Sequence, residues 1–137
     1  MRIRRRGRAG LAAVIVMVGC SVPSESLGPG NHVTVTNLVG HFQLTADNIQ
    51  NVTTTLTFTW QNPGTVAEID HQSFMPHGST LLIIRDAADS LRYEGKLLYQ
   101  LEDRTAAGVP GEWTVTFSLD ESVGDIDVTL EGLTPVD

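Results

Sequence analysis

Two histidines and a methionine lie close together in the segment His71-Gln-Ser-Phe-Met75-Pro-His77. Imidazole nitrogen and thioether sulfur are ligands that suit Cu(I). Copper handling by His71, Met75 and His77 is therefore one function that the residue types allow. The alternative interpretation is a turn with incidental ligand types, because no third strong ligand stands nearby and Pro-His-Gly-Ser at 76–79 is typical of a turn. We expect no resident metal or other cofactor.

Four acids near the end of the chain, Asp120, Glu121, Asp125 and Asp127, carry the oxygen ligands that calcium prefers. Their order does not follow the calcium-loop pattern. Asp125 and Asp127 also fall on the solvent side of an alternating segment, where charge discourages edge-to-edge aggregation. The sequence contains neither Gly-x-Ser-x-Gly nor Ser-x-x-Lys. We therefore expect a protein that is not an enzyme.

The only cysteine, Cys20, ends a leader of distinctive composition. Five arginines within residues 2–8 precede an apolar run at 11–18, and Gly19 stands directly before the cysteine. A spanning helix needs roughly 20 apolar residues. A run of roughly seven to fifteen behind a cationic segment is the format of an export signal.

The segment Met17-Val18-Gly19-Cys20 resembles the lipobox of bacterial lipoproteins, with Met17 where that motif usually has leucine. The resemblance implies that the Cys20 thiol carries diacylglycerol and that the chain is cut between Gly19 and Cys20. It implies a membrane partner through this lipid anchor and a location at the bacterial cell envelope. Ser21 is not the aspartate that often retains lipoproteins at the inner membrane, which favours the outer membrane if the source has one. Ordinary secretion and twin-arginine export are the alternatives.

This processing would divide the chain into a signal peptide at 1–19, a lipidated cysteine with a flexible tether at 20–31, and one domain at 32–137. The stretch 21–31 is rich in Ser, Pro and Gly, which is typical of a tether. Loss of the leader would leave four basic against 16 acidic residues, a net charge of −12. Such a surface repels phosphate backbones, so we expect no nucleic-acid partner.

Alternating apolar and polar residues dominate the domain and predict half-buried antiparallel strands. The pattern is cleanest at 52–60, where threonines occupy one face, and at 112–119 and 125–131. We predict that 80–85 pairs with 96–101 across a turn at 86–90. We also predict that a turn at 122–124 joins the last two strands as a hairpin, and that Trp60 and Trp113 lie in the core.

Three segments, 51–64, 82–86 and 108–116, are similar to small immunoglobulin-like domains of uncharacterised bacterial lipoproteins. Seven or eight strands at this spacing favour an all-β fold, a two-sheet antiparallel sandwich, over a barrel, and the similarity implies that the sandwich is immunoglobulin-like. It brings no catalytic residue, so the expected role is binding or structural, with a protein or another envelope component as partner. We expect the binding surface in a loop at 71–78, where Phe74 and Met75 are apolar.

Overall fold

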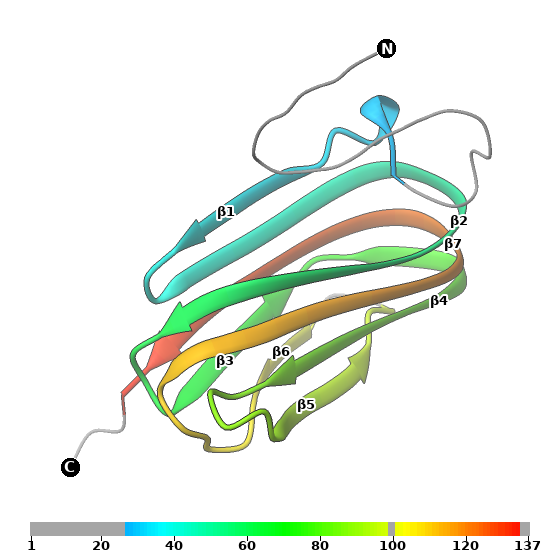
Figure 1. Ribbon diagram of the computed structural model, residues 1–137. Helices are drawn as coiled ribbons and strands as arrows, with labels where there is room; N and C mark the ends of the chain where they lie inside the picture. Colours follow the sequence, from blue (N-terminus) through cyan, green and yellow to red (C-terminus); the bar gives the residue numbers. More distant parts are fainter. Residues whose placement is uncertain (1–26, 99–100, 135–137) are drawn as a thin grey trace.

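The computed structural model describes residues 27–98 and 101–134, and these form seven antiparallel strands with one short 3-10 turn (Figure 1). The predicted signal peptide and lipidation site, Gly19 and Cys20 included, lie outside the described residues. No helix within the described ranges is long and apolar enough to cross a membrane. The elements are η4 (Pro29–Asn31), β1 (Thr34–Leu38), β2 (His41–Asn62), β3 (Val66–His71), β4 (Phe74–Arg85), β5 (Leu91–Lys96), β6 (Leu101–Arg104) and β7 (Gly111–Leu133).

The strands form one hydrogen-bonded sheet that folds back on itself. Strands β2 and β7 are 22 and 23 residues long and pair along most of their length. Figure 1 shows β2, β4 and β7 turning through a bend at one end and returning in the opposite direction. The prediction of an all-β antiparallel fold is confirmed. The prediction of two separate sheets differs from the structure, in which single long strands run through both layers. The immunoglobulin-like type stays a prediction.

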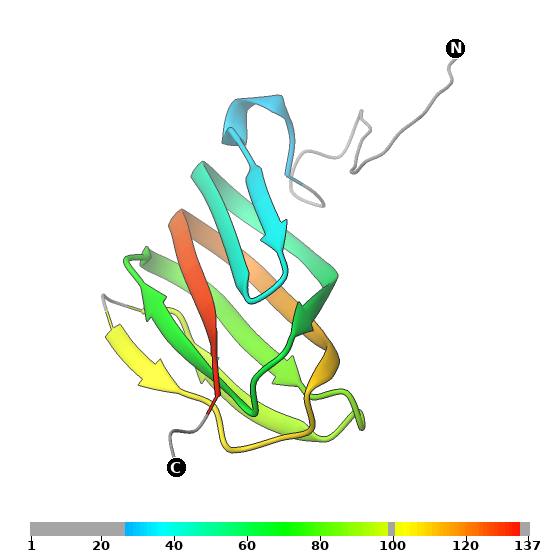
Figure 2. The ribbon, with the colours of Figure 1, turned by 90° about the vertical axis from the view of Figure 1, so that its left-hand side faces the viewer.

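The bend divides the sheet into two layers. The first layer holds β1, the first half of β2, the second half of β7, β3 and β6, with Phe42 opposite Leu130. The second layer holds the second half of β2, the first half of β7, β4 from Ser79 onward and β5, with Trp60 opposite Trp113. Figure 2 shows the two layers edge-on, with β1 at the far edge of the first.

Register shifts produce the bend. The pairing of β2 with β7 shifts three times between Ala46 and Thr54, and Asn48 and Asn51 have positive φ in this stretch. Extra residues on one strand bend it and raise its local twist. On β7 the corresponding point is Gly124, with φ of 139°. The hairpin predicted at 122–124 is therefore wrong, because β7 continues through these residues from one layer into the other.

Aromatic side chains fill the space between the layers. Trp60 and Trp113 are both buried and meet edge to face, with ring centroids 6.2 Å apart. Their indole N–H groups donate to the carbonyl oxygens of Leu38 at 3.0 Å and Val109 at 2.7 Å. Such partners are what a buried indole requires. The prediction that both tryptophans lie in the core is confirmed.

A tight turn led by Asp86 sets the pairing of β4 with β5. The buried carboxylate accepts hydrogen bonds from the backbone N–H groups of Ala88, Ser90 and Val109, at 2.9–3.0 Å. These bonds hold the pKa of Asp86 below its ordinary value. The turn brings Leu91 opposite Arg85, so the partner of β4 is 91–96. Of the predicted partner 96–101, Lys96 lies opposite Leu81 and the Leu97 N–H donates to the Thr80 carbonyl oxygen, whereas Leu101 pairs with His71 of β3.

The segment before β1 is attached to the domain. Leu27 packs against the hydrophobic core, and the side-chain amide of Asn31 donates to the carbonyl oxygens of Asp47 at 3.1 Å and Asn48 at 2.8 Å. Residues 27–31, which the sequence assigns to the tether, thus contact β2 where it enters the bend.

Candidate functional site

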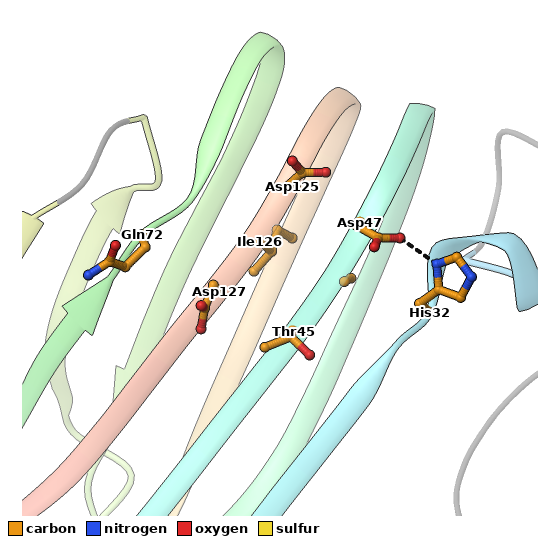
Figure 3. A pocket seen from close by; sticks show the side chains of 8 residues that line it. His32, Thr45, Asp47, Gln72, Asp125, Ile126 and Asp127 are labelled. Carbon is orange, nitrogen blue, oxygen red and sulfur yellow. Dashed lines mark hydrogen bonds and ion pairs between the residues drawn. The ribbon is translucent and has the colours of Figure 1, made fainter.

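A polar hollow of about 300 Å³ lies where β2 and β7 enter the bend, on the outer surface of the first layer (Figure 3). It is open to solvent, and carboxylates from both strands approach it. The residues that line it are His32, Thr45, Ala46, Asp47, Gln72, Asp125, Ile126 and Asp127.

Strand register places these polar groups together. Thr45 lies directly opposite Asp127, so their side chains share a face of the sheet. Ala46 and Ile126, the next pair, point into the core and are buried. The alternation that buries this pair keeps its neighbours on the outer surface.

Each carboxylate of the hollow has a different partner. His32 Nδ1 lies 2.7 Å from Asp47 Oδ1, and both side chains are largely exposed. The backbone N–H of Asn48 donates to Asp125 at 3.1 Å, and the side-chain amide of Gln43 donates to Asp127 at 3.2 Å. A carboxylate has about four acceptor positions. The hollow therefore retains acceptors for a cationic or hydrogen-bond-donating ligand.

Further carboxylates extend this surface over the first layer. Register places Glu131, Glu68 and Arg104 in one row and Asp70 and Glu102 in the next. Arg104 pairs with Glu68 at 3.5 Å, and His41 contacts Glu131. We name these carboxylates and those of the hollow the acidic face: Asp47, Glu68, Asp70, Glu102, Asp125, Asp127 and Glu131.

The three residues that could bind copper differ in their exposure to solvent. His71 is 1% exposed at the end of β3, and Met75 belongs to the hydrophobic core, whereas His77 is exposed. Burial lowers the pKa of His71, partly offset by Asp70 and Asp103. Within the described ranges, no three residues of the types His, Cys, Asp or Glu gather as a metal site. The arrangement lends no support to copper handling.

The segment 71–78 is not the loop that the sequence predicts. It comprises the end of β3, two connecting residues and the start of β4. Met75 is buried and cannot form a binding surface without unfolding, but Phe74 is 55% exposed. Phe74 also lies opposite Asp125, so its ring stands beside the hollow.

The calcium candidates are divided by the bend. Asp125 and Asp127 line the hollow, but Asp120 does not, and it pairs with Ser79 on the second-layer side of the bend. His32, Thr45 and Asp47 were not recognised in the sequence as site residues. No local signal marks them, because their proximity to Asp125 and Asp127 depends on strand pairing across some 80 residues.

Comparison with known proteins gives no family. No protein-family model matches the chain. No curated protein matches it either. A solved structure of TmCBM61 in complex with beta-1,4-galactotriose has a TM-score of 0.38 at 15% identity. The match covers 72% of this chain and 66% of that one, slightly less than two thirds of its length. A likeness this slight carries no argument about fold type or ligand.

Proposed function

We propose that this protein is a lipid-anchored component of the bacterial cell envelope whose β-domain acts by binding, without catalysis. The observation that carries the binding role is the meeting of Asp47, Asp125 and Asp127 in one open hollow. The anchor rests on the lipobox-like segment that ends at Cys20. The partner is an envelope component that presents cationic or hydrogen-bond-donating groups.

The geometry favours association over chemistry. Catalytic sites gain much of their electrostatic stabilisation by excluding water. The hollow is open, and His32 and Asp47 within it are largely exposed. Its carboxylates therefore act in a high effective dielectric, where charge steers and orients a partner. The copper alternative has no observation in its favour.

The anchor is tested by replacing Cys20 with serine in a bacterial host. Labelling with a clickable fatty acid should mark the wild-type protein and leave Cys20→Ser unlabelled, with the leader still attached. Mass spectrometry of the wild-type protein checks the cleavage point. A wild-type product with a bare thiol at position 20 would refute the anchor.

The hollow is tested by photo-crosslinking in intact cells, with a benzophenone residue at position 45. We expect one adduct that the double variant Asp47→Asn, Asp127→Asn reduces at least tenfold. The matched control is Asp89→Asn, Glu94→Gln, which removes two acids from the β4–β5 hairpin and leaves the hollow intact. Equal adduct yield in both double variants would show that the hollow does not bind the partner.

A further inference from the structure

Strand β1 is an edge of the sheet without the usual protection. Among the described residues it pairs only with β2, in unbroken register from Thr34 to Leu38. Natural edge strands are blunted by charges, proline or bulges, because their free N–H and C=O groups accept another strand. Strand β1 reads Thr-Val-Thr-Asn-Leu and has none of these devices.

Charged residues protect two other edge strands. Strand β6 reads Leu-Glu-Asp-Arg, and β5 carries Arg92, Glu94 and Lys96. Near Thr59 the returning half of β2 contacts β1, since the side-chain amide of Asn37 donates to the carbonyl oxygen of Thr59 at 2.8 Å. In contrast to β5 and β6, β1 carries no charged side chain, and its part from Thr34 to Thr36 lies before the contacts that Asn37 and the Leu38 carbonyl oxygen make with the returning half of β2.

Apolar side chains accompany the free edge. Val35 and Leu38 on β1 are 40% and 59% exposed, and Val33 and Val39 flank the strand at 41% and 73%. All five β1 residues are at least partly exposed. An added strand would cover these side chains while its backbone completes the ladder, as in β-strand addition.

The negative charge near β1 favours a cationic partner strand. Thr45 of the hollow lies directly beside β1, opposite Thr34, and Asp47 lies two residues further along β2, in contact with His32. The acidic face continues from there across β7. Strands are about 4.8 Å apart, so an added strand lies about 10 Å from β2, slightly beyond the screening length of about 8 Å in physiological salt, and the charge preference is strongest at low salt. A second copy, also at −12 after loss of the leader, is repelled, whereas a cationic segment is attracted.

We propose that the outer edge of β1 is a docking site for an extended, cationic segment of a partner protein, which adds to the sheet as an eighth strand. This inference rests on the proposed binding function and names the surface and the chemistry of the partner. Backbone hydrogen bonds to β1 supply the affinity, and lysine or arginine side chains directed toward the hollow supply the preference.

The test uses the acylated protein without its leader, residues 20–137, in detergent micelles and a blocked peptide, acetyl-Lys-Val-Thr-Val-Lys-Val-Thr-Lys-amide. Hydrogen–deuterium exchange should show slower exchange in β1 when the peptide is added at millimolar concentration, and β6 should not change. A peptide with glutamate in place of lysine, and one with alternate N-methylated amides, should each bind at least tenfold more weakly.

Val35→Lys places a charge on the free edge, and Leu101→Lys is its matched control. Both residues lie on edge strands with similar exposure, 40% and 44%. Val35→Lys should lose at least tenfold in peptide affinity and Leu101→Lys less than twofold, with unchanged circular dichroism.

Equal losses in the two variants, no protection of β1, or a dimer in sedimentation that Val35→Lys dissolves would each overturn the inference. If the position-45 adduct still forms while the peptide leaves β1 unprotected, the edge proposal fails and the binding function stands. If the position-45 adduct is missing while the peptide slows hydrogen exchange in β1, the proposal that the hollow binds the partner is refuted instead.

Discussion

The bend that shapes the hollow depends on Gly124, and Gly124→Ala tests it. The residue has φ of 139°, a backbone conformation that L side chains rarely adopt. A Cβ built at this position would overlap the backbone carbonyl oxygen of Phe74 and lie 3.0 Å from the Cα of Met75. Neither neighbour is the flexible end of a side chain, so β4 or β7 must move to admit a methyl group.

The magnitude combines two terms. Holding a residue in such a conformation costs about 1–3 kcal/mol, and forcing an extra methyl group into packed structure costs about 1–3 kcal/mol. The sum is about 4 kcal/mol, a large part of the stability of a domain of this size. About 1 kcal/mol shifts the Tm of such a domain by roughly 3–5 °C. We therefore expect Gly124→Ala to lower the Tm by at least 10 °C.

Thermal unfolding followed by circular dichroism measures the effect, and urea titration gives the free energy of unfolding. Gly30→Ala is the matched control, because a Cβ at Gly30 has no atom within 4 Å and its φ is not in the left-handed region. The control should stay within about 2 °C of wild type. A Gly124→Ala protein as stable as the Gly30→Ala protein would refute the account of the bend.

Two further predictions concern pH. Burial lowers the pKa of His71, so its neutral form is favoured in the folded state; its contribution is complete above the ordinary pKa of about 6.5 and declines as pH falls below it. In the His71→Leu variant, the free energy of unfolding from urea titration should depend less on pH between pH 7 and 5 than in the wild-type protein. The same pH dependence in both proteins would contradict this. Backbone hydrogen bonds lower the pKa of Asp86, so its contribution is present above about pH 4 and declines below it. Asp86→Asn should lower the Tm at pH 7 and weaken its dependence on pH below 4, whereas the exposed Asp89→Asn should do neither.

Period-two alternation predicted the strand faces well. Trp113, Val115, Phe117 and Leu119 are buried as expected, because one face of a strand must lie against the opposite layer. The threonines of β2 at 53, 55, 57 and 59 are exposed on the other face. These features depend only on neighbours in the chain.

The pattern could not reveal which strands continue through a bend. A glycine with positive φ serves a hairpin turn and a bend inside a strand equally well, so Ser122-Val-Gly124 has the same local signal in both. Pairing decides between them, and Val123 lies opposite His77 of β4, within a continuous β7. For the same reason the sequence pattern could not predict the hollow, because its carboxylates come together only through the pairing of β2 with β7.

If Cys20 carries the proposed lipid anchor, the acidic face influences how the domain is oriented relative to the membrane. A domain with a net charge of −12 beyond the leader is repelled by anionic headgroups, and the repulsion is greatest on the side where carboxylates are densest. Asp70 and Glu102 are in adjacent register on that face, and the one arginine of the row already pairs with Glu68. The bilayer would therefore turn the acidic face and the neighbouring β1 edge away from itself. A cationic partner would meet both surfaces together, since Thr34 at the start of β1 lies opposite Thr45 of the hollow.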